Sequence, residues 1–165
     1  MRLGVRRLVY TAVLAALAVA FQLGTLPQAF TGPAINANLY VSSMFVGPLS
    51  GVIVGLITPW VALMTGIMKL APAVPVIMAG NASLALVSHY VGRWNKYAGL
   101  ALAAVVKWAV MTLGIKYLIS AGTTIPPAAY ASLTLTQLFT ALGGAVVAGI
   151  VLEALARFKH GRSYS

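Results

Sequence analysis

The sequence predicts an all-α integral membrane protein: one domain over residues 1–165, folded as a compact bundle of six transmembrane helices. Hydrophobic residues make up 61% of the chain and charged residues only 7%, against roughly 45–50% and about 25% in soluble domains. A helix needs roughly 20 residues to cross about 30 Å of hydrocarbon. Six spans therefore fit this length with short connections, seven would leave almost none, and a water-soluble domain is excluded.

The predicted spans cover about residues 8–26, 36–46, 49–68, 76–92, 97–119 and 131–156. The first is long enough to cross a bilayer, so we interpret it as a span and not as a signal peptide. Residues 27–35 are rich in Pro and Gly, which predicts a loop. Residues 36–68 form either one long tilted helix or two helices broken at Gly47-Pro48, where proline lacks an amide donor and disfavours helix in the residue before it.

The distribution of basic residues favours the two-helix interpretation. The chain has 11 Lys and Arg but a single acid, Glu153, which gives a formal charge of +10. Lys and Arg in short loops resist translocation and so mark the cytoplasmic side. Six spans place on that side Arg2, Arg6, Arg7, Arg93, Lys96, Arg157, Lys159 and Arg162. Both termini are therefore expected in the cytoplasm, and no long basic face is available for nucleic acid.

Catalysis is disfavoured by the scarcity of reactive side chains. The chain lacks cysteine, which excludes disulfides, thiol catalysis and thiolate metal sites. Acid–base catalysis needs paired tunable groups and metal binding needs clustered ligands, but only Glu153, His89 and His160 are present. Glu153 is expected to pair with Arg157, four residues further along the same helix. We therefore expect that this protein is not an enzyme and that it binds no cofactor and no metal ion.

The same scarcity restricts how the chain could drive transport. Ion-coupled carriers generally keep a carboxylate within the membrane, whereas the only acid here lies at the edge of a span. The phosphate-binding pattern Gly-x-x-x-x-Gly-Lys is also absent from the sequence. If this chain moves a solute, a partner protein must supply the energy.

Small residues recur at helical spacing in the first predicted span. Ala12, Ala16 and Ala20 would form a nearly flat face, and such faces let two helices approach closely. This face could bind a partner protein or pack inside the bundle. Gly51 and Gly55 repeat the spacing in the third span, where packing inside the bundle is favoured.

Polar residues within the spans lie toward the predicted outer half of the bundle. Amide side chains are costly in hydrocarbon unless they are hydrogen-bonded, so Asn81 and Gln137 either line a ligand site or join neighbouring helices. Gln137 shares one helix face with Thr140. Lys107 lies about ten residues into the fifth span, roughly 15 Å deep, where a lone cation is costly. It must meet water, a cluster of carbonyls or an anion, and we favour a functional role.

Three segments resemble those of a known transport family. They are the basic start running through Arg-Leu-Val-Tyr-Thr-Ala at residues 7–12 into an Ala-x-x-x-Ala helix, Phe-Val-Gly-Pro-Leu-Ser-Gly at residues 45–51 followed by Gly55, and Val-Pro-Val-Ile-Met-Ala-Gly-Asn at residues 74–81. In this order and in a six-span layout, the chain resembles the substrate-binding S component of energy-coupling factor (ECF) transporters, which import vitamins and micronutrients. The resemblance covers nearly the whole chain.

The resemblance implies a protein that captures a small molecule from outside, in a pocket near the outer face, with residues 27–38 as a lid. The implied substrate-binding residues are Asn36, Asn38, Tyr40, Asn81, Lys107 and Gln137, with Thr140 beside the last. The outer half of the predicted bundle has two lysines and no carboxylate, which disfavours a cationic substrate and favours a neutral or anionic one.

The resemblance also implies partners. The face formed by Ala12, Ala16 and Ala20 would dock on a membrane coupling subunit that is attached to two ATPase subunits. The alternatives are a scaffold subunit resembling rod-shape-determining membrane proteins, or a small channel. Polar residues converging on one outer pocket would favour substrate capture, and a dry interior filled with leucine would favour the scaffold.

Overall fold

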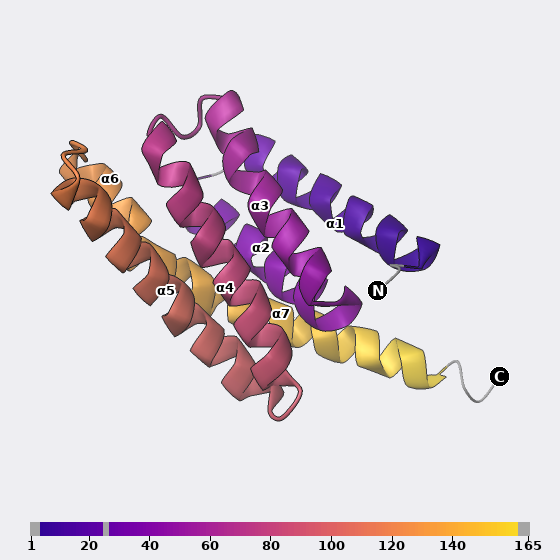
Figure 1. The fold of residues 1–165 in the computed structure, drawn as a ribbon. Helices are drawn as coiled ribbons and strands as arrows, with labels where there is room; N and C mark the ends of the chain where they lie inside the picture. Colours follow the sequence, from indigo (N-terminus) through magenta and orange to yellow (C-terminus); the bar gives the residue numbers. More distant parts are fainter. Residues whose placement is uncertain (1–3, 25–26, 162–165) are drawn as a thin grey trace.

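The described chain is entirely helical. The computed structural model describes residues 4–24 and 27–161, with side chains up to residue 158, and this part contains no strand. The helices are α1 (Val5–Leu23), α2 (Gln28–Val41), α3 (Pro48–Met64), α4 (Val74–Gly92), α5 (Lys96–Ser120), α6 (Pro127–Leu133) and α7 (Leu135–Gly161). The all-α prediction is confirmed (Figure 1). The predicted end of the first span at Leu26 lies outside the described residues, as do Arg2, Arg162 and the side chains of Lys159 and His160.

Among the described residues, four helical stretches are long and apolar enough to cross a membrane. They are Val5–Leu23, Ala71–Gly92, Lys96–Ser120 and Pro127–Phe158. The third helix, Pro48–Met64, is apolar but shorter, and α2 has 14 residues followed by one turn of π-helix, Ser42–Val46. The structure thus supports a multi-pass membrane protein.

The predicted break at Gly47-Pro48 is confirmed. Gly47 has a φ of +146°, which a residue with a side chain adopts only with strain. Pro48 is the first residue of α3, where its missing N–H would have no partner within the helix. The chain reverses here, so α2 and α3 are separate helices.

The predicted loop over residues 27–35 is wrong, because α2 begins at Gln28. Gly32 and Pro33 of this segment do not form a turn, and they instead pack against α7. A Cβ added to Gly32 would lie 2.6 Å from Thr140 Cγ2 of α7, and one added to Gly143 would lie 3.4 Å from Pro33 Cγ. The proposed lid, residues 27–38, is therefore a helix packed against α7 over most of its length.

The predicted sixth span, residues 131–156, contains a break. The short helix α6 ends at Leu133, and Thr134 leaves the helical conformation with φ −119° and ψ −92°. The Thr134 hydroxyl donates a hydrogen bond to the carbonyl of Tyr130, and the backbone N–H of Gln137 donates one to the carbonyl of Thr134. α6 is therefore a separate short helix at one end of α7 (Figure 1).

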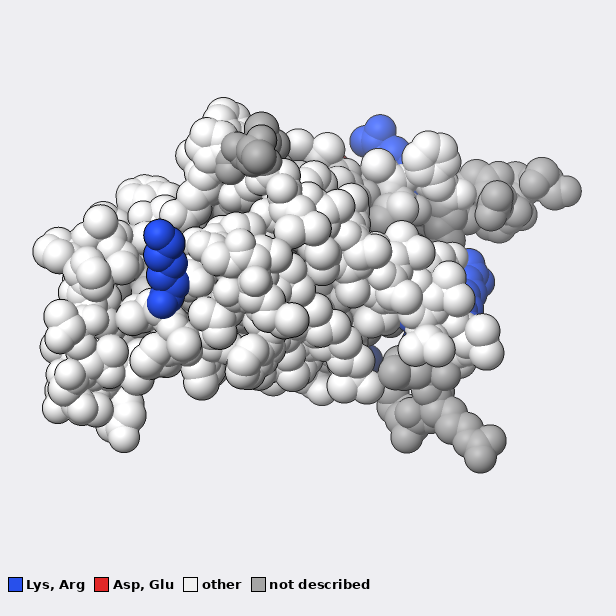
Figure 2. All heavy atoms as spheres, turned by 90° about the horizontal axis from the view of Figure 1, so that it is seen from above, with Lys and Arg blue, Asp and Glu red and all other residues white. Residues whose placement is uncertain are grey.

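The two ends of the bundle differ in what they carry. Figure 1 shows the start of α1, the α4–α5 turn and the end of α7 at one end, with the α3–α4 connection and α6 at the other. Figure 2 shows a broad face without charge between Lys and Arg side chains that lie toward the ends. This distribution is the one expected of a bundle surrounded by hydrocarbon.

Glycines set the close approach of helices in the core. Gly51 and Gly55 are both buried, as predicted. A Cβ on Gly51 would lie 2.7 Å from Ser43 Cβ, and one on Gly55 would lie 2.9 Å from Asn81 Cβ. Small residues let helix backbones approach closely enough for short polar side chains to reach between them.

Candidate functional site

A cavity of about 890 Å³ lies at the end of the bundle that carries α6. Sites for small molecules usually measure about 300–1,000 Å³. The polar residues of its wall are Gln22, Gln28, Thr31, Thr58, Lys69, Asn81, Lys107, Thr124, Ser132 and Gln137. Of these, Gln28, Lys69 and Thr124 are exposed, so the cavity reaches the surface at this end.

Lys107 forms the buried floor of this cavity. It lies near the middle of α5 and is only 3% exposed. Its Nζ donates hydrogen bonds to Asn36 Oδ1 of α2 at 2.6 Å and to Asn81 Oδ1 of α4 at 2.8 Å. Three helices therefore meet at one ammonium group, and a cluster of amide carbonyls satisfies it.

The two amides are held in place from behind. Asn36 Nδ2 donates to Thr140 Oγ1 of α7 at 3.3 Å. Asn81 Nδ2 donates to the carbonyl of Gly55 at 3.0 Å and to Thr58 Oγ1 at 3.4 Å, both in α3. Because each NH₂ group has acceptors on its far side, the network assigns each amide oxygen to the lysine. We name this set, Lys107, Asn36, Asn81, Thr140 and Thr58, the floor cluster.

The floor cluster depends on glycines in the neighbouring helices. A Cβ on Gly144 would lie 2.6 Å from Asn36 Cβ. A Cβ on Gly80 would lie 2.5 Å from Met111 Cγ and 3.6 Å from Lys107 Cγ. These positions let α2 press on α7 and α4 press on α5. Side chains as short as asparagine can then reach the ammonium.

The structure brings five of the seven predicted substrate-binding residues together. Asn81, Lys107 and Gln137 line the cavity. Asn36 and Thr140 stand directly behind the lysine through the hydrogen bonds of the floor cluster. Gln137 is half-buried in the wall, and its Nε2 donates to the carbonyl of Ser132 at 3.3 Å.

The structure does not place Asn38 and Tyr40 at the cavity. Asn38 faces α1, where its Nδ2 donates to the carbonyl of Leu14 at 2.6 Å. The Tyr40 hydroxyl donates to the carbonyl of Leu100 at 3.1 Å, and the ring is fully buried. Asn38 is about 200° around α2 from Asn36, and Tyr40 lies one turn further from the cavity. Both side chains join helices of the bundle.

Several residues of the cavity wall are not among those that the sequence predicts to bind substrate. Gln28 Oε1 accepts a hydrogen bond from Ser132 Oγ at 2.9 Å, which links α2 to α6. Gln22 Oε1 is buried with no hydrogen-bond partner among the described residues. The position of Gln22 at the polar end of the first span was the available signal. Gln28 lies in the segment predicted to be a loop, and Ser132 lies in the predicted sixth span, where nothing in the sequence distinguishes it as a wall residue.

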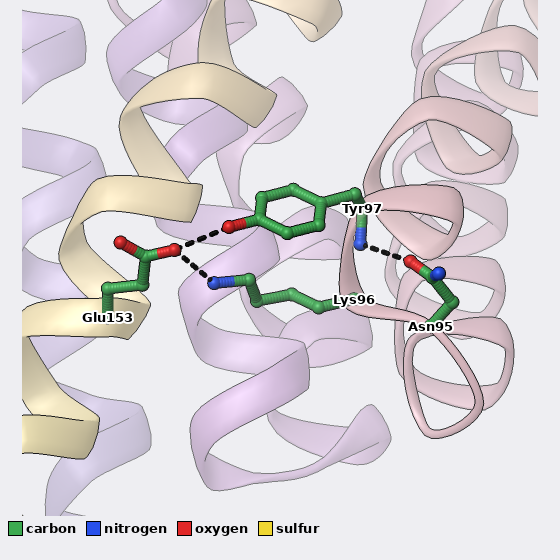
Figure 3. A network of polar contacts seen from close by, with 4 residues as sticks. All are labelled: Asn95, Lys96, Tyr97 and Glu153. Carbon is green, nitrogen blue, oxygen red and sulfur yellow. Dashed lines mark hydrogen bonds and ion pairs between the residues drawn. The ribbon is translucent and has the colours of Figure 1, made fainter.

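The only acidic side chain of the sequence, Glu153, lies near the end of α7 that is opposite to the cavity. Its contacts are shown in Figure 3. Glu153 Oε1 accepts hydrogen bonds from Lys96 Nζ at 2.8 Å and from the Tyr97 hydroxyl at 2.5 Å. Asn95 caps α5 by accepting from the Tyr97 amide. Glu153 therefore pairs with Lys96 of α5 and not, as expected, with Arg157 of its own helix. The packing of α5 against α7 brings Lys96 to it, and this contact between distant segments could not be predicted from spacing along one helix.

The alanine face of α1 points away from the bundle. Ala12, Ala16 and Ala20 are exposed. The opposite side of the helix carries the buried Thr11, whose hydroxyl donates to Ser50 Oγ of α3 at 2.9 Å, and the buried Ala18. Within the described chain, this small-residue face is left uncovered.

Comparison with known proteins gives one result. A family model described as "ECF transporter, substrate-specific component" matches residues 6–156. No curated protein and no solved structure matches the chain. The match includes the floor cluster, the cavity wall and the alanine face, and it agrees with the apolar helices of a multi-pass membrane protein. The chain therefore belongs to the family of substrate-specific components of ECF transporters.

Proposed function

We propose that this chain is the high-affinity capture subunit of an ECF-type importer for a vitamin or related micronutrient that is neutral or anionic. The observation that carries the proposal is the cavity of about 890 Å³ with a polar, buried floor in a bundle that is otherwise poor in charge. The chain would form one domain of six spans over residues 1–165.

The interior favours substrate capture over a scaffold. Polar side chains from α2, α3, α4, α5 and α7 converge on the floor cluster. Buried polar groups are costly in a bundle that only needs to hold itself together. A scaffold subunit could fill the same space with leucine at lower cost.

The cavity end is proposed to face the outside. The opposite end carries Arg6, Arg7, Arg93, Lys96 and Arg157, and short basic segments remain on the cytoplasmic side. This orientation puts both termini in the cytoplasm and opens the cavity to external substrate.

A separate coupling subunit and two ATPases would supply the energy. The chain has no phosphate-binding loop, and its one acid is engaged far from the cavity. The exposed face of Ala12, Ala16 and Ala20 gives a flat surface against which a helix of the coupling subunit could pack.

Substrate capture is tested on the full chain purified in detergent. Native mass spectrometry and thermal-shift measurements against a panel of vitamins should find one compound that is retained tightly and raises the melting temperature. If no member of the panel binds, the capture function is contradicted. Binding of proteins alone, with no small molecule, would support the scaffold.

Docking is tested by Ala16→Leu, with Leu17→Phe as the control at an exposed position about 100° around α1 from Ala16. The larger side chain at position 16 should prevent close packing and reduce recovery of the coexpressed coupling subunit at least about tenfold. The melting temperature of the isolated chain should stay unchanged, because Ala16 is exposed. Equal recovery of both variants would show that the alanine face is not the docking surface.

A further inference from the structure

We infer that the substrate carries an anionic group, a carboxylate or a phosphate, and that this group binds Lys107 at the floor of the cavity. The inference rests on the proposed capture function and names the chemical class of its substrate. Lys107 would be the counter-ion of the bound substrate, with Asn36 and Asn81 as the residues that position it.

The ammonium of Lys107 has no negative partner in the described chain. It is 3% exposed, lies near the middle of a helix that is long enough to span the membrane, and bonds only to two neutral amide oxygens. A buried cation is strongly favoured by a nearby opposite charge. The floor cluster holds the lysine but leaves this charge uncompensated.

The chain itself cannot supply the missing charge. Its one acidic side chain, Glu153, lies at the other end of the bundle, where it is bonded to Lys96 and Tyr97. Any compensating anion at the floor must therefore enter from outside, and the cavity that Lys107 lines is the route to it.

The geometry leaves room for that anion. An ammonium has three N–H donors, and the two amide oxygens use two of them. The amide NH₂ groups are bonded to Thr140 on one side and to Gly55 and Thr58 on the other. The amides therefore cannot flip without losing these bonds, and the third N–H of the lysine remains available to a group in the cavity.

The rest of the wall indicates what else the substrate carries. Above the floor the lining is largely apolar and includes Ile35, Pro59, Ala62, Ile77 and Leu133. Nearer the surface, the unpartnered Oε1 of Gln22 can accept one hydrogen bond. The matching ligand has one anionic end, a mainly apolar body and a hydrogen-bond donor toward the mouth.

The test uses pairs of compounds that differ only in the charged group. The carboxylate pairs are pantothenate with panthenol, nicotinate with nicotinamide, and biotin with biotin amide. The phosphate pairs are riboflavin 5′-phosphate with riboflavin, and pyridoxine 5′-phosphate with pyridoxine. Binding to the full chain in detergent is measured by thermal shift and by titration calorimetry. An anionic member should bind at least about 30-fold more tightly than its neutral partner, because leaving a buried charge unpaired is costly.

Two variants assign this preference to the lysine. Lys107→Met should abolish the difference within the pair, whereas Lys116→Met, on the exposed outer part of the same helix, should preserve it. Lys107→Arg keeps the charge and should retain part of the preference. The comparison within a pair on the wild-type chain needs no variant, so it stands even where Lys107→Met lowers the yield of folded protein.

The outcomes separate this inference from the proposed function. Tight binding of a neutral compound, with its anionic partner no better, would overturn the anion site and leave the capture function intact. An anion preference that survives in Lys107→Met would also overturn it. Failure of every compound to bind would count against the capture function and the inference together.

Discussion

Two lysines on one helix show opposite ways of holding a cation in this bundle. Lys96, at the start of α5, pairs with the carboxylate of Glu153, and the two side chains are 28% and 46% exposed. Lys107, about three turns further along, is 3% exposed and bonds only to the amide oxygens of Asn36 and Asn81. The protein places its one acid where the cation is already close to water.

The difference indicates what each site is for. A partly exposed ion pair contributes little to stability, because water solvates both partners well. A buried ammonium needs stronger support, and neutral amides give hydrogen bonds without cancelling the charge. The Lys96 pair is complete as it stands, whereas the floor cluster gives Lys107 only neutral acceptors beside a cavity that opens to the surface.

The largest effect on stability is expected from removing an amide beside the buried lysine. Asn81→Leu keeps the size of the side chain but deprives Lys107 of one acceptor and the Gly55 carbonyl of one donor. We expect the free energy of unfolding to fall by about 3 kcal/mol, measured by thermal or denaturant unfolding in detergent.

The double variant Asn81→Leu with Lys107→Met is the control for this prediction. Removing the charge should recover part of the loss, because no ammonium is then left short of partners. A fall of less than about 1 kcal/mol for Asn81→Leu alone would show that the buried lysine does not depend on this amide.

The sequence predicted the chemical environment of Lys107 better than it predicted which residues form the floor cluster. Span lengths placed Lys107 near mid-membrane and required water, carbonyls or an anion around it, and the structure shows carbonyls from Asn36 and Asn81. The sequence could not separate Asn36 from Asn38. The directions of these two side chains depend on where α2 begins, and the Pro and Gly content of residues 27–35 predicts a loop where the helix in fact starts.

The errors in the fold come from packing between distant segments. Gly32 and Pro33 indicate a turn locally, but their role is to bring α2 against Thr140 and Gly143 of α7. The break at Thr134 could not be predicted, because neither Thr134 nor its two sequence neighbours is Gly or Pro. The break at Gly47-Pro48 was predictable because local backbone chemistry alone decides it.

An intermediate effect is expected one layer behind the lysine. Thr140→Val keeps the shape of the side chain but removes the oxygen that accepts from Asn36 Nδ2 at 3.3 Å. The loss of one buried hydrogen bond should lower the free energy of unfolding by about 1 kcal/mol, measured by the same unfolding experiment.

The buried Ser88→Ala is the matched control for Thr140→Val, because its hydroxyl donates only to the carbonyl of Ala85 in its own helix. It should change stability less, since the lost bond lies within a single turn. If the two variants are equal, the anchoring of Asn36 by α7 does not contribute to stability.

The smallest effect is expected at the exposed pair of Lys96 and Glu153, although it contains the only acidic side chain of the sequence. Glu153→Gln removes the charge opposite Lys96 while keeping groups that can bond to Lys96 and Tyr97. The fall in melting temperature should be no more than about a third of that for Asn81→Leu, because water solvates both freed groups. Raising the salt concentration should reduce the difference between wild type and Glu153→Gln, since exposed charges are screened. A fall as large as that of Asn81→Leu, independent of salt, would mean that the ion pair and not the floor cluster is the main polar link between the helices of this bundle.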